Sequence, residues 1–538
     1  MSLCSSSPLF SSRRWFVGLA LAAITALPAL QATAQTEPEP DTDRPTEDDF
    51  AIIDCDPVDW VEVLGSSFFD DARDVAAFDR GIRARGEVYV TGSFQGGGFS
   101  LADFGNTFNP DTWGIPSRFG SSDAFLAKLN DCGVWEWVVT GGGQGSDAGE
   151  AVVVDSQGDV IVVGTMDGTH TLTMDSGIPN MEGGFATANS DPTAFAAKYS
   201  AQGVLQWFKT LGEGEALDVD IDSNDDAWLT LTTPASLSGV IMRVAGSDGS
   251  PSVEEFFNAT SDLRITGISV GDQDRICVAG NFRQTLNIND IAGGGTQSFT
   301  ASEPTPSVFV AFFDGAGALH QAQTLSATTG HVTASAAAAT VLDQPFSWPN
   351  GGIYDWDCLV AGRFSGTLAL NTATLMTQNS ADFDGWFARF RWQDSAPVSA
   401  VQVSGAGRQE VTDISVRKAS PSQIWVSGHF NNQLTAWEEE QAWEGWAAWS
   451  PSLSSNGGRD AFIIGYGLSS TASGQWQTSF GGAGDDLGLG IFVQPLSLRI
   501  YGVGSFDDEA SFVLPSGPPV DLDTNRGQQG FVTGIVVP

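Results

Sequence analysis

The fold is decided by an apolar strand that ends in glycine, Val88-Tyr89-Val90-Thr91-Gly92, and by its recurrence along the chain. Five clear copies and one degraded copy follow: Val160-Ile161-Val162-Val163-Gly164, Ile276-Cys277-Val278-Ala279-Gly280, Cys358-Leu359-Val360-Ala361-Gly362, Ile424-Trp425-Val426-Ser427-Gly428, Ile500-Tyr501-Gly502-Val503-Gly504 and the degraded Ala227-Trp228-Leu229-Thr230-Leu231. From Gly92 to Gly504 the period is about 69 residues. Self-similarity at a fixed period indicates a repeat architecture.

The second repeat shows what one unit contains. A strand over 151–154 leads through the polar turn 155–159 into the strand 160–163. After a long connection to Asp191, a third strand over 194–199 and a short turn lead into a fourth strand over 204–208. Short β-branched and aromatic runs between Gly, Asp, Asn and Ser are typical of an all-β chain. Four antiparallel strands repeated in this way predict the blades of a β-propeller.

The two ends of the repeat region complement each other. The last repeat supplies three strands, over 488–493, 499–504 and 530–537, whereas a surplus strand over 58–64 precedes the first repeat. The surplus strand is followed by Gly65 and the pair Asp70-Asp71, as the strand 476–482 is followed by Asp485-Asp486. We therefore expect the N-terminal strand to complete the last sheet, because closing the ring removes exposed edges. The sequence predicts a single seven-bladed β-propeller over residues 58–538, made of four-stranded antiparallel blades.

The repeat resembles the bacterial extracellular seven-bladed β-propeller repeat, or SBBP repeat. The matching residues are Gly86-Glu87-Val88-Tyr89-Val90-Thr91-Gly92-Ser93-Phe94, Asp123-Ala124-Phe125-Leu126-Ala127-Lys128-Leu129, Trp135 and Gly481-Gly482-Ala483-Gly484-Asp485-Asp486. The resemblance is strongest in the first two and last two repeats and weakest in the third. It implies a propeller fold and an exported location, and it implies no particular reaction.

The N-terminus has the form of an export signal. Arg13-Arg14 precede an apolar run that reaches Leu30, and Ala32-Thr33-Ala34 offers a small-residue cleavage site, which predicts a signal peptide over 1–34. The arginine pair also fits the twin-arginine export route, and ordinary secretory signals carry such pairs too. Residues 35–57, rich in Pro, Glu, Asp and Thr, are expected to form an acidic disordered leader. The mature chain is therefore expected in the periplasm or outside the cell.

The charge of the chain excludes some partners. The formal net charge is −41, with 65 acidic and 24 basic residues. A chain this acidic repels nucleic acid and anionic lipid surfaces, and no later segment has the roughly 20 apolar residues that span a bilayer. We expect a monomer that contacts neither nucleic acid nor the membrane interior, and no cofactor. A calcium-binding surface remains an alternative explanation of the acidity.

Four cysteines follow the signal peptide. Cys277 and Cys358 fall inside central strands, where we expect buried free thiols. Cys55 and Cys132 precede tryptophan strands of neighbouring repeats, and the spacing leaves open whether they form a disulfide.

Several motifs that suggest chemistry have simpler explanations. Gly267-Ile268-Ser269-Val270-Gly271 matches a nucleophile pattern, but it lies in a strand and lacks the strand-to-helix turn. The acids between Asp218 and Asp226 lack the Gly and Glu of a calcium loop and coincide with a predicted tight turn. The acids after each Gly-rich corner, Asp70-Asp71, Asp147 and Asp485-Asp486, are expected to accept backbone N–H groups, with an axial cation as the alternative. His170, His320, His331 and His429 show no metal-ligand spacing, and we predict neither a metal site nor a catalytic residue.

One stretch departs from the repeat. Trp437, Trp443, Trp446 and Trp449 crowd into the connection between the second and third strands of the sixth repeat, together with Glu438-Glu439-Glu440 and Glu444. Four indoles beside carboxylates predict a platform for a sugar or a protein, because aromatic side chains dominate such contacts. The alternative is a loop that buries its own indoles. The tryptophans are the candidate ligand-binding residues of the sequence.

These observations predict an exported, non-enzymatic β-propeller that acts as a binding or scaffold module for a protein or a polysaccharide. The long connections over 92–122, 164–193 and 428–459 are the expected working surface, since loops on a rigid scaffold carry recognition. Two alternatives remain: a secreted polysaccharide hydrolase or lyase with axial carboxylates, which would need a paired acid and base, and a calcium-dependent surface adhesin.

Overall fold

The computed structural model describes most of the repeat region. The described residues are 59–65, 68–78, 86–95, 100–102, 122–142, 145–167, 171–175, 184–187, 192–290, 294–301, 305–340, 357–370, 374–379, 382–392, 397–417, 423–437, 452–467, 476–495, 499–515, 518–523 and 527–536. The predicted signal peptide and the predicted leader lie outside them. None of the described residues belongs to an α-helix long and apolar enough to cross a membrane.

The all-β prediction is confirmed, because antiparallel strands make up most of the described chain and no α-helix occurs in it. The strands fall into quartets, each named here by its first strand. The quartets are β2 (Asp70–Phe78), β3 (Glu87–Phe94), β5 (Asp123–Asn130) and β6 (Trp135–Gly142); β7 (Asp147–Val154), β8 (Val160–Met166), β11 (Thr193–Tyr199) and β12 (Leu205–Glu213); β13 (Glu215–Ile221), β14 (Ala227–Thr233), β15 (Ser238–Val244) and β16 (Pro251–Ala259); β17 (Leu263–Val270), β18 (Ile276–Phe282), β21 (Ser307–Phe313) and β22 (Leu319–Thr329); β23 (Val332–Thr340), β24 (Asp357–Phe364), β27 (Asp384–Arg391) and β28 (Pro397–Ser404); β29 (Gln409–Arg417), β30 (Gln423–Trp437), β31 (Ser452–Gly467) and β32 (Trp476–Gly482); and β33 (Leu487–Val493), β34 (Arg499–Phe506), β37 (Gln529–Val536) and β1 (Trp60–Gly65).

The N-terminal strand lies in the same sheet as the C-terminal strands. β1 pairs with β37 in antiparallel register from Trp60 opposite Gly534 to Leu64 opposite Gly530. The Asp59 carboxylate accepts the Val536 N–H at 2.7 Å and adds a further bond between the two strands.

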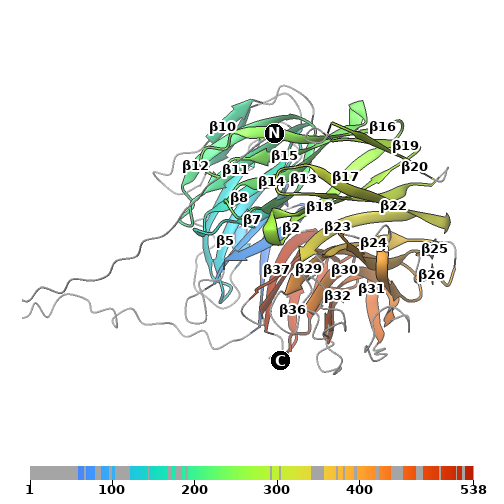
Figure 1. Ribbon diagram of the computed structural model, residues 1–538. Coiled ribbons are helices and arrows are strands. Elements are labelled where there is room, and N and C mark those ends of the chain that lie inside the picture. Colours follow the sequence, from blue (N-terminus) through green and yellow to red (C-terminus); the bar gives the residue numbers. More distant parts are fainter. Residues whose placement is uncertain are drawn as a thin grey trace, which may run out of the picture. The chain divides into compact units, whose positions relative to one another are not determined.

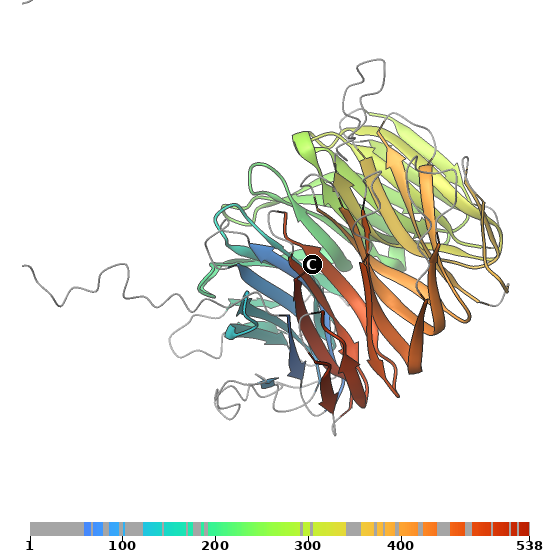
Figure 2. The same cartoon turned by 90° about the horizontal axis from the view of Figure 1, so that it is seen from below.

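The first strands of the quartets contact one another in sequence. β2 contacts β7, β7 contacts β13, β13 contacts β17, β17 contacts β23, β23 contacts β29, β29 contacts β33, and β33 contacts β2. In Figure 1 these strands gather around the middle of the picture. Figure 2 shows the blue N-terminal strands beside the red C-terminal ones. A hydrophobic cluster joins them, with Val88 and Val90 of β3 packed with Tyr501 and Val503 of β34.

Most outer strands are extended by the following quartet. The added strands come from the connection between the second and third strands of that quartet: β4 (Ser100–Ala102) pairs with β1, β9 (Thr171–Asp175) and β10 (Gly184–Thr187) extend β6, β19 (Thr285–Asp290) and β20 (Thr296–Thr300) extend β16, β25 (Thr367–Ala369) and β26 (Thr374–Met376) extend β22, the far ends of β30 and β31 extend β28, and β35 (Glu509–Phe512) and β36 (Val520–Asp523) extend β32. The long connections of the sequence therefore widen the sheets. In the β13 quartet the connection is the short 3₁₀ turn Pro234–Ser236, and β12 pairs only with β11 among the described strands.

The prediction of free thiols at Cys277 and Cys358 is wrong. These cysteines form a disulfide between β18 and β24, with 6.1 Å between their Cα atoms. Cys277 lies three residues before Gly280 and Cys358 lies four before Gly362. Because successive strand residues point to opposite faces, this one-residue offset makes the two thiols face each other between neighbouring sheets. Cys132 is also disulfide-bonded, and its partner lies outside the described residues, so the Cys55–Cys132 pair stays a prediction.

Candidate functional site

A pocket opens at the corner between β1 and β2. Its volume is about 230 Å³, and its lining residues are Phe69, Asp70, Asp71, Ser93, Gln95, Ser122, Ser146 and Gln528. They lie in or next to β2, β3, β5, β7 and β37, so three neighbouring quartets contribute. Phe68 and Phe69 of this corner are 54% and 63% exposed, the former beside the pocket and the latter in its wall. We call this site the corner pocket.

The sequence places aromatic residues where the equivalent corners have small ones. Asp70, Asp147 and Asp486 are equivalent, because each begins or immediately precedes a first strand and donates its N–H to the preceding quartet's third strand or to the residue before that strand. The acceptors are the carbonyl oxygens of Gln528, Ser122 and, within β31, Arg459. In this alignment Phe68 occupies the position that Gly145 and Gly484 have at the other two corners. A Cβ atom on either glycine would overlap the backbone of Asp167 or Asp507, respectively. The sequence analysis missed Phe68 and Phe69, although comparing the corners would have found them.

The prediction that corner acids accept backbone N–H groups is confirmed. Asp70 Oδ1 accepts the Gln95 N–H at 3.0 Å, and Asp147 Oδ1 accepts the Asp167 N–H at 3.3 Å. The Asp486 carboxylate accepts the N–H groups of Gly482 and Asp507 at 2.7 and 3.2 Å. The bonds from Gln95, Asp167 and Asp507 hold the end of a second strand to the corner, and the bond from Gly482 holds the end of the fourth strand β32. Burial raises the pKa of Asp486 to about 7.

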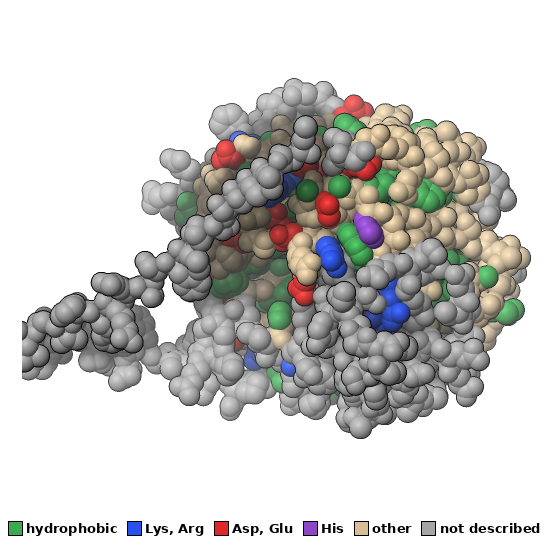
Figure 3. All heavy atoms as spheres, viewed as in Figure 1, with side chains coloured by type: hydrophobic (Ala, Val, Ile, Leu, Met, Phe, Trp, Pro, Cys, Tyr) green, Lys and Arg blue, Asp and Glu red, His purple; other side chains and the backbone are tan. Residues whose placement is uncertain are grey.

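Asp71 and its neighbours set the charge beside the corner pocket. Asp71 Oδ1 accepts the Ser93 N–H at 3.0 Å and the Ser93 hydroxyl at 2.6 Å, and Oδ2 accepts Arg73 Nε–H at 3.1 Å. Arg73 also pairs with Glu150 of β7 at 2.5 Å. Burial alone would lower the pKa of Arg73, but the Glu150 and Asp71 carboxylates raise it above its ordinary value. Two carboxylates, those of Asp71 and Glu150, pair with one guanidinium, and the lining of the pocket itself carries Asp70 and Asp71 without a basic residue, so the wall is electronegative. Figure 3 shows acidic and basic side chains together near the middle of this view.

Three aspartates of the first strands cap the inner edges of the sheets. Asp74 accepts the N–H groups of Val75 and Val152, both at 2.8 Å. Asp218 bonds the N–H groups of Val219 and Ile268 in the same way, at 2.8 and 2.7 Å. Asp413 bonds those of Ile414 and Ile491, both at 2.7 Å. Each carboxylate thus satisfies its own strand and the next quartet's inner strand, where no ladder partner exists.

Burial dominates the titration of these capping aspartates. Desolvation, together with the charge of Asp413, raises the pKa of Asp74 to about 8. Desolvation raises the pKa of Asp413 to about 6 and that of Asp218 well above its ordinary range. The described residues contain no group of three or more His, Cys, Asp or Glu side chains placed to hold a metal ion. The arrangement fits edge capping.

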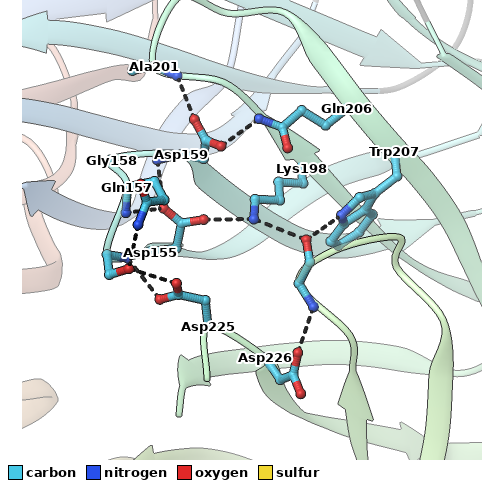
Figure 4. A network of polar contacts seen from close by, with 12 residues as sticks. Asp155, Gln157, Gly158, Asp159, Lys198, Ala201, Gln206, Trp207, Asp225 and Asp226 are labelled. Carbon is cyan, nitrogen blue, oxygen red and sulfur yellow. Dashed lines mark hydrogen bonds and ion pairs between the residues drawn. The ribbon is translucent and has the colours of Figure 1, made fainter. Parts of the chain in front are cut away.

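A second network joins quartets at their opposite ends. Lys198 of β11 contacts the Asp155 carboxylate at 2.7 Å and donates to the Gly246 carbonyl at 3.0 Å (Figure 4). Trp207 Nε1–H donates to the same carbonyl at 3.1 Å. Lys128 and Trp137 repeat this arrangement on the Ala201 carbonyl at 2.9 and 3.1 Å. Trp60 Nε1–H donates to the Asp131 carbonyl at 3.0 Å. The repeated tryptophan therefore links neighbouring sheets through the hydrogen bond of its indole N–H.

The turn role predicted for the acids between Asp218 and Asp226 is confirmed for Asp222, whereas Asp218 and Asp220 lie in β13 and cap the edge of the next quartet, a role that was not predicted. Asp222 Oδ1 accepts the N–H groups of Asn224 and Asp226 inside the tight turn. Asp225, with a positive φ of 62°, accepts the N–H and hydroxyl of Ser156 in the preceding quartet at 2.9 and 2.7 Å. Ser269 of the nucleophile-like motif lies in β17 and donates its hydroxyl to Asp220 at 2.9 Å. Its backbone is a regular strand, as expected.

The tryptophans predicted as a binding platform lie largely beyond the described residues. Trp443, Trp446 and Trp449 are outside them, and Trp437 ends β30 with its backbone opposite Gln402 of β28. The described ends of the segment therefore lie at the outer edge of the β23 quartet. Of the histidines, His170 is outside the described residues, His320 stacks on Trp392 at 4.0 Å, and His429 lies 3.5 Å from Glu410. The three described histidines belong to no group of His, Cys, Asp or Glu that could hold a metal ion.

No family model and no curated protein matches this sequence, so the resemblance to the SBBP repeat stays a prediction. Among solved structures, the chain is similar to the Dos1 propeller, at 8% identity and a TM-score of 0.34 over 88% of this chain and 95% of that one. It is also similar to the WD40 domain of Toxoplasma gondii coronin, at 9% identity and 0.28 over 70% and 81%. An exo-β-1,3-galactanase from Phanerochaete chrysosporium follows, at 9% identity and 0.26 over 88% and 96%.

Proposed function

We propose that the chain is an exported, closed, seven-bladed β-propeller that acts as a non-enzymatic recognition module. The quartets would be its blades. Two observations support closure: the contacts of the first strands return from β33 to β2, and β1 occupies the outer position beside β37. The clusters that pack between neighbouring quartets support it too, since one of them includes both β3 and β34.

The corner pocket is the observation that carries the recognition role. It lies where an N-terminal strand, a first blade and a second blade would meet, and its corner replaces glycine by exposed phenylalanine. An exposed aromatic pair next to a polar cavity is a feature of binding surfaces. Both carboxylate oxygens of each capping aspartate accept backbone N–H groups, which favours a structural role for these residues over acid–base catalysis.

The disulfide between Cys277 and Cys358 supports export, because structural disulfides persist mainly outside the cytosol. The partner class is a protein or a polysaccharide of the cell envelope or medium. A monomer fits a module whose edges are covered by strands of the following quartet.

A pull-down with the chain from Gln35 to Pro538 tests the proposal. Native envelope and culture medium are incubated with the immobilised chain, and bound protein and glycan are analysed separately. Capture of a defined component without new reducing ends is the expected result. Reducing ends that accumulate on incubation would show the hydrolase instead, and capture lost in chelator would show the calcium-dependent adhesin. Capture of nothing would refute the recognition role.

A further inference from the structure

We infer that the corner pocket binds one unit of a neutral saccharide, with a sugar ring against Phe69 and its hydroxyl groups on the polar wall. This inference rests on the proposed recognition function and names its ligand class. It is independent of the tryptophan segment of the sixth repeat, which stays a separate prediction.

The polar wall matches a ligand with many hydroxyl groups. Five of its residues carry uncharged hydroxyl or amide groups: Ser93, Ser122, Ser146, Gln95 and Gln528. Hydroxyl and amide side chains both donate and accept hydrogen bonds, as sugar hydroxyls do. They come from both sides of the pocket, because Gln95 follows β3 while Gln528 precedes β37. A ligand between them would be held around its rim.

The aromatic wall matches the apolar face of a sugar ring. Phe69 is 63% exposed and is the one aromatic side chain of the lining. Its ring offers a flat, electron-rich face that attracts C–H groups with partial positive charge. A pyranose presents such C–H groups on one face and hydroxyls at its edge. One apolar wall opposite a polar rim therefore selects a ring of this kind.

The charges exclude anions and disfavour a cation. Asp70 and Asp71 line the corner pocket and no basic residue does, so an acidic sugar or a phosphate would be repelled. A basic side chain would need carboxylate oxygens, yet Asp71 already accepts Ser93 twice and Arg73 once. Asp70 and Asp71 accept hydrogen bonds from Gln95 and Ser93, and their negative charge polarises these donors.

The size of the pocket limits the ligand to one ring. Its volume of about 230 Å³ is below the roughly 300–1,000 Å³ of pockets for drug-sized ligands. We therefore expect a polysaccharide to be held through a single unit or a chain end, and affinity for a free monosaccharide to be weak.

The test measures binding of cellohexaose, laminarihexaose and chitohexaose to the chain from Gln35 to Pro538 by titration calorimetry. A tri-lysine peptide and a tetragalacturonate serve as cationic and anionic probes. Phe69→Ala removes the stacking surface, and Phe256→Ala removes a 44% exposed phenylalanine of β16 as the matched control. Because both side chains are exposed, both variants are expected to keep the unfolding midpoint of the parent chain.

At least one neutral hexasaccharide should bind, and Phe69→Ala should weaken it about tenfold, the loss of one aromatic contact, while Phe256→Ala leaves it unchanged. Gln95→Ala should weaken the same probe. Binding of the tri-lysine peptide or of tetragalacturonate alone overturns the inference, as does binding of no probe. If the envelope component of the pull-down is still captured by Phe69→Ala, the recognition function stands and this assignment fails. If the pull-down captures nothing, the recognition function itself fails.

Discussion

Removal of the N-terminal strand should destabilise the whole repeat region. β1 buries four apolar side chains, those of Trp60, Val61, Val63 and Leu64, against β37 and its neighbours. At about 1.5–3 kcal/mol for each buried side chain, the strand contributes about 6–12 kcal/mol. The net stability of a folded domain is about 5–15 kcal/mol. The loss is therefore comparable with the entire free energy of unfolding.

The assay compares a chain that begins at Ile52 with one that begins at Ser67; both carry Cys132→Ser, and the longer one also carries Cys55→Ser, so that their thiols match. Urea unfolding followed by circular dichroism should show a large drop in midpoint for the shorter chain. Hydrogen exchange should show loss of protection first in β37, which loses the pairing of Phe531 to Gly534 with β1.

A synthetic peptide covering residues 56–67 should restore part of the lost stability, because a ligand that binds only the folded chain stabilises it by mass action. Equal urea midpoints for the two chains, with equal protection of the β37 amides, would refute the closing role of β1. A restored midpoint with a scrambled peptide would show that the effect is unspecific.

Three further outcomes are expected. Replacing Cys277 and Cys358 by serine should lower the free energy of unfolding by about 4–5 kcal/mol, the loop-closure value for a separation of 81 residues; guanidinium unfolding with and without reductant measures it, and an unchanged midpoint in both would contradict it. The free energy of unfolding should fall as the pH rises from about 4 to about 8, because the folded chain keeps protons on Asp74 and Asp413 that the unfolded chain has released. Asp413→Asn should reduce this pH-dependent fall by up to about 3 kcal/mol. The urea midpoint is measured against pH, and the same slope for variant and parent would count against the prediction. Lys198→Met should lower the free energy of unfolding by about 3–5 kcal/mol, because it leaves the buried Asp155 carboxylate without its cation. Thermal unfolding compares this variant with the control Lys209→Met, and equal midpoints for the two would contradict the prediction.

Residues that repeat in every unit could be predicted from the sequence, since each copy corrects the interpretation of the others. The strands, the corner acids and the position of β1 were accessible in this way. The disulfide does not follow from the repeat alone. It depends on the one-residue offset between the positions of Cys277 and Cys358 in their repeats, which makes the two side chains face each other between neighbouring strands. The added strands such as β9 are too short to be predicted from their own pattern: only Leu172 and Met174 alternate with polar residues there, and the pairing with β6 lies outside the repeat unit.

The corner pocket could not be predicted from the repeat, because it lies where one corner departs from the others. The same departure explains the shape of this corner. At the equivalent corners, Gly145 and Gly484 let the chain lie directly against the backbone of Asp167 and Asp507, with no room for a Cβ atom. Phe68 stands at the same place after β1, and no phenylalanine fits where a methyl group does not. This corner must therefore stand away from the strand that its counterparts touch, and its two aromatic rings remain exposed. Phe68 thus prevents the close packing seen at Gly145 and Gly484, and its neighbour Phe69 forms the apolar wall of the pocket.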